Sequence, residues 1–378
     1  MCVHTFLFWN QTKAKTVNTG ALLERLSGTS SNKMSSMLSD SVFFNDKDVI
    51  RTRVPIINLM LSGHLDGGLK PGLTCIAGPS KHFKSNLSLV LVSAYLRKYP
   101  DAVCLFFDNE FGSTPDYFTS QGVDIDRVVH CPFIDVEELK FDIVKKLEAV
   151  KRGDKVIIYI DSIGNVASKK ELEDAKNEKS AQDMTRAKQI KSLFRMVTPY
   201  LTVNDIPCIA VNHTYETQEM YSKTVMSGGT GPMYSADTVI ILGKQQDKDG
   251  KELLGYNFVM NAEKSRTIKE KSKLDLQVSF QGGINTYSGL LKIAQELGFV
   301  TKPQNARYQR NYLDLETGEM YLITDDEKKW TEEDSNSLEF WKPMFSHKPF
   351  MDAVSDAYKL KAVEVSQEVF DEVDQLFG

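Results

Sequence analysis

Between residues 72 and 280, short apolar runs rich in β-branched and aromatic residues alternate with segments that have helical periodicity. The first five runs lie at 73–77, 102–107, 128–131, 156–160 and 207–211, and the helical segments at 86–98, 115–122, 136–152 and 182–201. Continuous apolar strands separated by helices predict a mostly parallel sheet that is covered on both faces. Three further runs follow one another through short turns, which predicts an antiparallel end to this sheet; they lie at 238–242, 256–260 and 274–280.

The composition excludes several classes of protein. Of the 378 residues, 41% are apolar and 26% are charged, which is typical of a globular protein with a large core. No run of about 18 apolar residues occurs, so we expect no membrane-spanning helix. The 5 cysteines lack the spacing of metal ligands or of a disulfide framework, which favours a reducing cytoplasm.

The regions that flank this alternation differ in character. Residues 1–50 are interpreted as an N-terminal arm, disordered to about position 20 and then briefly helical at 20–26. Residues 51–288 form the predicted core, and residues 289–378 a small helical and acidic C-terminal region. From Thr324 onward there are 14 acidic and 6 basic residues, a net charge of −8, compared with −5 for the whole chain. A basic surface for nucleic acid therefore remains compatible with the overall charge.

The segment GPSKHFKS joins the first predicted strand to a helix. At such a junction, backbone N–H groups bind phosphate, Lys84 would contact the β- and γ-phosphates, and Ser85 would bind Mg²⁺. The motif departs from GxxxxGK[ST] because Phe83 replaces the second glycine, so its ring must turn away from the nucleotide. Alone, the motif also fits an ordinary strand-to-helix corner. The predicted phosphate-binding residues are Gly78, Pro79, Ser80, Lys81, His82, Phe83, Lys84, Ser85 and Asn86.

Two carboxylates follow predicted strands. Asp161 ends the fourth run and would hold Mg²⁺ through water beside Ser85, although strands that end in aspartate are common. Glu110 follows the second run and could polarise the water that attacks a γ-phosphate. Asp108, or a plain solvated loop acid, is the alternative for this role.

A series of motifs makes the pattern specific. In chain order they are GPSKHFKS, CLFFDNE, VIIYIDS, CIAVNHTYETQ, MSGGTGP, EKSRTIKEKSK and FQGGINTYSG. Together they resemble the RecA recombinase family, above all its bacteriophage T4-type branch, in which a phenylalanine in the phosphate loop is usual. The resemblance implies an α/β fold: a RecA-like P-loop ATPase core with a mostly parallel central sheet, an N-terminal oligomerisation arm and a small C-terminal domain.

The resemblance also implies a function. The expected activity is ATP-dependent homologous recombination, with ATP and Mg²⁺ as cofactors and a helical filament on single-stranded DNA. This filament would pair with homologous duplex DNA and exchange strands, aided by a mediator and a single-strand-binding protein. A ring-forming RecA-fold helicase and a nucleotide-gated DNA-binding scaffold that hydrolyses little ATP are the alternatives.

Several site residues are implied by position within the family motifs. Asp161 resembles the Walker B acid, Glu110 the catalytic glutamate, and Tyr117 the aromatic residue that stacks on adenine. His213 stands where RecA has a glutamine that senses the γ-phosphate and relays it to a DNA-binding loop, although a buried structural histidine is the alternative.

A basic stretch at 263–273 contains five basic and two acidic residues. The resemblance implies that its Lys264 and Arg266 enter the nucleotide site of a neighbouring subunit and stabilise the γ-phosphate. An exposed basic turn is the alternative.

Two long loops follow the fourth and fifth predicted core strands, at the sheet edge where α/β proteins bind ligands. Basic, glycine and apolar residues together suit a single strand held by its backbone, whereas solvated loops are the alternative. The candidates in and after the first loop, 164–183, are Lys169, Lys170, Lys179, Arg186 and Lys188. The candidates in the second loop, 214–231, are Tyr215, Lys223, Met226, Gly228 and Gly229.

Within the arm, Val42, Phe43 and Phe44 form an apolar triplet between polar residues. The family uses such an arm to add a strand to the neighbouring subunit's sheet, with aromatic side chains in pockets. A strand in this subunit's own core is the alternative.

Overall fold

The computed structural model describes residues 19–43, 47–178, 184–217, 224–304, 307–322, 330–361 and 375–376. It divides the chain into two units, Met1–Lys47 and Asp48–Gly378. In the first unit, α1 (Thr19–Gly28) confirms the short helical stretch, and η1 (Leu38–Asp40) follows it. Val42 and Phe43 lie in a turn, so the alternative of a local core strand is wrong for them, whereas Phe44 falls outside the described residues.

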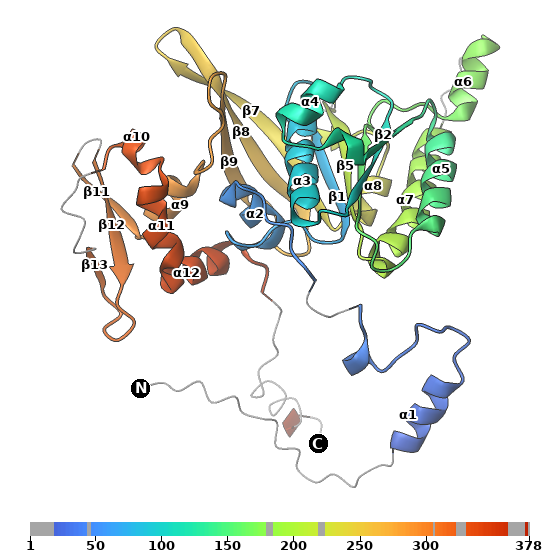
Figure 1. Cartoon of the computed structure of the whole chain (residues 1–378), viewed down its shortest axis with the longest axis horizontal. Coiled ribbons are helices and arrows are strands. Elements are labelled where there is room, and N and C mark those ends of the chain that lie inside the picture. Colours follow the sequence, from blue (N-terminus) through green and yellow to red (C-terminus); the bar gives the residue numbers. More distant parts are fainter. Residues whose placement is uncertain are drawn as a thin grey trace. The chain divides into compact units, whose positions relative to one another are not determined.

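The second unit is built around one large sheet with the strand order β10-β9-β8-β7-β1-β5-β4-β2-β3 (Figure 1). The parallel strands are β1 (Gly72–Gly78), β2 (Val103–Asp108), β3 (Val128–Pro132), β4 (Val156–Asp161), β5 (Pro207–Glu216) and β7 (Thr238–Asp249). The antiparallel strands are β8 (Glu252–Ser265), β9 (Lys273–Ser279) and β10 (Gly283–Ile284). The parallel core and its antiparallel end are both confirmed.

Helices cover both faces of this sheet. The helices on one face are α2 (Pro55–Ser62), α3 (Lys84–Lys98) and α4 (Pro115–Ser120); those on the other are α5 (Val136–Ala149) and α7 (Thr185–Val203). In β4, Ile157 and Tyr159 join the first apolar cluster, whereas Ile158 and Ile160 join the second. Successive strand side chains alternate between faces, so a strand covered on both sides must be apolar throughout. No helix within the described residues could cross a membrane.

The C-terminal region contains a small sheet as well as helices. Its strands β11 (Val300–Gln304), β12 (Arg307–Leu313) and β13 (Met320–Leu322) are antiparallel. Its helices are α9 (Leu290–Glu296), α10 (Glu332–Ser335), α11 (Leu338–Ser346) and α12 (Lys348–Tyr358). The prediction of a helical region missed the sheet because β12 contains arginines in place of an apolar run. Arg310 is nonetheless buried and donates to the Phe340 carbonyl at 2.9 Å.

Candidate nucleotide and polynucleotide site

Four predicted or alternative site positions come together at the carboxyl edge of the parallel strands. In the sheet register, Gly78 at the end of β1 pairs with His213 in β5, and Asp108 at the end of β2 pairs with Asp161 at the end of β4. Neighbouring parallel strands end at the same edge, so residues distant in sequence converge there. This is the edge at which open α/β sheets bind their ligands.

The segment GPSKHFKS forms the turn from β1 into α3. Lys84 is the first residue of α3, is 6% exposed, and donates from Nζ to the Pro79 carbonyl at 2.8 Å. Burial lowers the pKa of Lys84, although Glu110 and Asp161 act in the opposite direction. His82 donates from Nδ1 to the Ser80 carbonyl at 2.9 Å, which closes the turn. A helix N-terminus with a buried lysine beside it is suited to bind a phosphate.

Phe83 has a backbone conformation that ordinarily favours glycine, with φ 64°. Its ring stacks on that of Phe258 in β8, with 4.9 Å between centroids and 21° between planes. The ring therefore turns away from the phosphate loop and packs against the apolar core. This is the orientation expected from the replacement of glycine by Phe83.

Asp161 is 3% exposed, and one of its oxygens is already paired. Oδ2 accepts hydrogen bonds from Ser85 Oγ at 2.8 Å and from Tyr159 OH at 2.6 Å. Oδ1 is buried and has no hydrogen-bond partner within the described residues. Burial raises the pKa of Asp161. An unpartnered carboxylate oxygen beside a serine hydroxyl is the kind of oxygen donor set that fits Mg²⁺.

Glu110 lies in the turn that follows β2 and contacts two residues of the site. Its Oε1 is 2.8 Å from His213 Nε2 and also accepts from Ser162 Oγ. The hydrogen bond with His213 lowers the pKa of Glu110, so the carboxylate is ionised at neutral pH and Nε2 must donate. Sequence reasoning missed Ser162, for which its position directly after Asp161 was the available signal.

Asp108, the alternative to Glu110, holds the turn. Its Oδ1 accepts the backbone N–H groups of Glu110 at 3.0 Å and Phe111 at 2.9 Å, and its Oδ2 lies 3.2 Å from His130 Nε2. Asp108 is 2% exposed. Because both of its oxygens are engaged, its position suits the shaping of the turn that presents Glu110.

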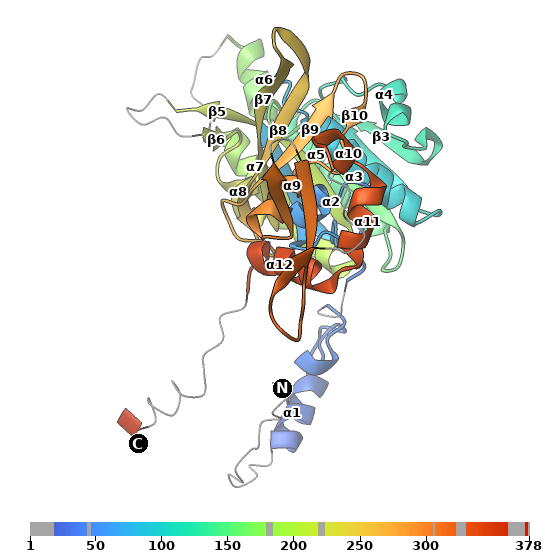
Figure 2. The ribbon, with the colours of Figure 1, turned by 90° about the vertical axis from the view of Figure 1, so that its left-hand side faces the viewer.

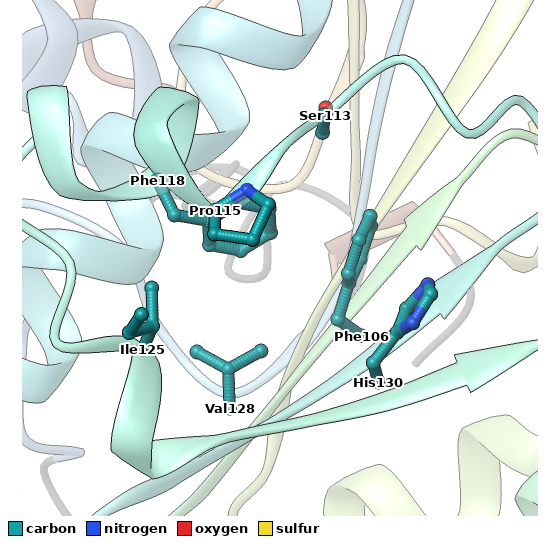
Figure 3. A pocket seen from close by; sticks show the side chains of 7 residues that line it. All are labelled: Phe106, Ser113, Pro115, Phe118, Ile125, Val128 and His130. Carbon is teal, nitrogen blue, oxygen red and sulfur yellow. The ribbon is translucent and has the colours of Figure 1, made fainter.

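Tyr117 lies on α4, and its hydroxyl hydrogen-bonds to Asn86 Oδ1 near the start of α3. Burial raises the pKa of Tyr117 to about 12, so the hydroxyl stays protonated. A cavity of about 270 Å³ is lined in part by Pro115 and Phe118 of α4 (Figure 3). Among the described residues, none of the predicted site residues lines it; its lining consists of Phe106, Ser113, Pro115, Phe118, Ile125, Val128 and His130.

The first predicted loop contains a helix, α6 (Lys169–Lys176). Ser168 and Glu171 form a reciprocal cap at its start, which stabilises an otherwise isolated turn of helix. Lys169 and Lys170 are exposed on this helix, and Lys188 is exposed on α7. Lys179 lies outside the described residues.

The second predicted loop begins as a hairpin, because β5 extends to Glu216 and pairs with β6 (Thr224–Met226). Figure 2 shows this hairpin and α6 at the same end of the sheet. Tyr215 is 56% exposed, whereas Met226 is 4% exposed and packs in the second apolar cluster. The assignment of Met226 to DNA contact is therefore not supported by its position, and Lys223 lies outside the described residues.

Gly228 and Gly229 follow the hairpin with φ 83° and 75°, a conformation that L side chains rarely adopt. A Cβ at Gly228 would also lie 2.7 Å from Ile190 Cδ1. Arg186, predicted to contact DNA, instead donates within the chain to carbonyl oxygens of the first loop and to Ser227 Oγ at 3.0 Å. Its guanidinium is therefore engaged internally.

Lys264 and Arg266 lie at the opposite, amino edge of the sheet, because the start of β7 pairs with the end of β8 there. Lys264 Nζ donates to the carbonyls of Met233 at 2.9 Å and Tyr234 at 3.0 Å. Arg266 is 70% exposed and pairs with Asp237 at 3.0 Å. Neither residue is brought to the phosphate loop of its own chain.

Comparison with known proteins gives the family. The RecA N-terminal domain matches residues 47–285, and the C-terminal domain of the bacteriophage T4 recombination and repair protein matches residues 287–354. The chain is 58% identical to the recombination and repair protein of Enterobacteria phage T4 over 94% of its length and 90% of that protein. It is 26% identical to the RecA protein of Synechococcus elongatus over 73% of its length and 78% of that protein. With its parallel sheet, phosphate loop and carboxylates at the strand ends, the chain belongs to the RecA recombinase family and is of the bacteriophage T4 type.

Proposed function

We propose that this protein forms filaments on single-stranded DNA and uses ATP to drive homologous pairing and strand exchange. The observation that carries the proposal is the position of His213. Its ring is 2.8 Å from Glu110 Oε1, and its backbone carbonyl accepts the N–H of Ser227 at 2.8 Å, where the second loop ends. One residue thus connects the candidate hydrolytic carboxylate to a candidate polynucleotide loop.

The residues at the carboxyl edge have different roles in binding and hydrolysing ATP. Lys84 and the N-terminus of α3 bind the triphosphate, and Ser85 and Asp161 would hold Mg²⁺, which neutralises charge on the phosphate oxygens when bound. Glu110, ionised at neutral pH, orients the attacking water and accepts its proton. Tyr117, on α4, is the residue that we propose stacks on the adenine ring.

Polynucleotide would bind at the end of the sheet that carries α6 and the β5–β6 hairpin. Lys169, Lys170 and Lys188 supply positive charge for the phosphate backbone, and exposed Tyr215 supplies a surface on which a base can stack. Such contacts hold the strand without reading its sequence. Homology would then be read by base pairing with the incoming duplex.

Filament assembly would complete the nucleotide site. Lys264 and Arg266 cannot serve their own phosphate loop, so we propose that they act on the nucleotide of the next subunit. In the described residues β3 is an open edge of the large sheet. The arm residues Val42, Phe43 and Phe44 are the proposed partners of a neighbouring sheet edge of this kind.

Two measurements test the proposal: ATP turnover with and without single-stranded DNA, and joint-molecule formation between single-stranded and homologous duplex DNA. We expect DNA to stimulate turnover without processive unwinding, and Lys84→Ala to abolish exchange. Lys145→Ala, at an exposed position of α5, removes an equal charge and should behave like the unaltered protein. Normal joint-molecule formation by Lys84→Ala would refute the nucleotide assignment, processive unwinding would favour the ring helicase, and negligible turnover would favour the scaffold.

A further inference from the structure

Arg186, in the first turn of α7, connects the start of the first candidate polynucleotide loop to Ser227 in the second. Nε donates to the Val166 carbonyl at 2.6 Å, and Nη2 donates to the Ile163 carbonyl at 3.3 Å and to the Gly164 carbonyl. Nη2 also donates to Ser227 Oγ at 3.0 Å, and Ser227 Oγ donates to the Gly164 carbonyl at 2.8 Å. The first loop and the second are therefore joined through the Arg186 guanidinium and through the direct Ser227–Gly164 hydrogen bond.

This cluster touches His213 from two sides. A Cβ at Gly164 would lie 2.3 Å from His213 Cδ2, so the glycine backbone packs directly against the imidazole. Ser227 donates its backbone N–H to the His213 carbonyl at 2.8 Å, and Asn212 Nδ2 donates to the Ser227 carbonyl at 3.0 Å. Movement of either loop at Gly164 or Ser227 therefore displaces His213, which contacts Glu110.

The chemistry of the guanidinium explains why an arginine serves here. Its planar fork presents several fixed N–H donors, whereas a lysine ammonium is a compact point charge on a flexible stem. Hydrogen bonds from a charged donor are stronger than those between neutral groups. The fork can therefore hold carbonyls at the start of the first loop and the Ser227 hydroxyl of the second at once, whereas a lysine could hold only some of these acceptors.

We propose that Arg186 is a positioning residue that couples the nucleotide site to both polynucleotide loops, and not a DNA contact. The inference rests on the proposed function, because it assumes that the loops bind DNA and that Glu110 acts on ATP. Without the fork, the Ser227–Gly164 hydrogen bond alone would join these two segments, and their connection would be weaker. DNA bound to the loops then restrains His213 less, although the phosphate loop itself is intact.

The test compares Arg186→Gln and Arg186→Lys with the unaltered full-length protein. Phosphate release is measured against ATP concentration, without DNA and with saturating single-stranded DNA. For Arg186→Gln we expect basal turnover and the KM for ATP to stay within about twofold, and stimulation by DNA to fall about tenfold, a usual size for coupling between sites. Arg186→Lys should retain an intermediate stimulation. Arg195→Gln removes the same charge from an exposed position of the same helix and should retain full stimulation.

A second pair of variants avoids changing the charge. Ser227→Ala removes the hydroxyl that bridges Arg186 and Gly164, so stimulation should fall, whereas Ser227→Thr keeps a hydroxyl and should restore it. Thermal unfolding of each variant reports whether the fold is intact. If Arg186→Gln does not fold, the Ser227 pair decides the proposal.

Several results would overturn the inference. Full stimulation of Arg186→Gln would show that the fork does not couple the sites. Equal loss of basal and stimulated turnover would indicate a general structural role, and weaker DNA binding with normal stimulation at saturation would indicate a DNA contact. If instead the unaltered protein shows no stimulation by DNA, the proposed function itself fails, which is a separate result.

Discussion

Replacing Phe83 with glycine tests why this chain departs from the usual phosphate loop. Two effects oppose each other. A non-glycine residue in the left-handed region costs about 1–2 kcal/mol, and at φ 64° Phe83→Gly would recover that cost. The substitution would also lose the stack on Phe258, with centroids 4.9 Å apart, and the burial of the ring against the core.

The loss should exceed the gain. Removing a fully buried phenylalanine ring costs about 3–5 kcal/mol, and since Phe83 is only half-buried we take about half of this. Glycine adds about 0.5–1 kcal/mol of backbone entropy to the cost of folding. The free energy of unfolding of Phe83→Gly should therefore fall by about 1 kcal/mol.

The assay is urea unfolding of the unaltered protein, Phe83→Gly, Phe258→Leu and the double variant. The stacked pair should give a coupling free energy of about 0.5–1.5 kcal/mol in this cycle. Affinity for ATP should change little, because the proposed phosphate contacts are backbone N–H groups, which glycine retains. A coupling near zero, or a gain in stability for Phe83→Gly, would refute the reasoning that the ring acts through Phe258.

The two remaining predictions concern the carboxylates. Burial raises the pKa of Asp161, so ionisation of this carboxyl opposes folding. Asp161→Asn should therefore match the unaltered protein in stability below pH 3.8 and become relatively more stable as the pH rises. ATP turnover of this variant should fall about 100-fold. Equal pH dependence of unfolding for both proteins would contradict this. The hydrogen bond from His213 is the main cause of the lowered pKa of Glu110, so in His213→Ala that pKa should return toward 4.5. The acid limb of the pH–rate profile of ATP hydrolysis should then move to higher pH. His213→Gln keeps a hydrogen-bond donor, so its acid limb should lie at lower pH than that of His213→Ala. If the acid limbs of His213→Ala and the unaltered protein coincide, His213 is not the cause of the lowered pKa of Glu110.

The sequence predicted where side chains at strand ends converge, but not the contacts of individual side chains. Strand ends can be read from local patterns, so the convergence of Asp161, Glu110 and His213 could be anticipated from a parallel sheet. The partners of a side chain depend on packing between distant segments. Met226 was predicted to contact DNA because its loop combines basic, glycine and apolar residues, yet it is buried. Arg186 was predicted to contact DNA because of its charge, yet its Nε and Nη2 donate within the chain.

The amino-acid sequence by itself determined the order of strands and helices in the parallel core, because apolar runs and helical periodicity are properties of neighbouring residues. It also predicted a phosphate loop after the first strand and acids at the ends of two later strands. Only the tertiary structure decided that the Phe83 ring packs on Phe258, that Asp161 retains an unpartnered oxygen, and that Lys264 lies at the far edge of the sheet. These facts depend on which segments meet in space, and long-range contacts leave little trace in the local pattern of a single chain.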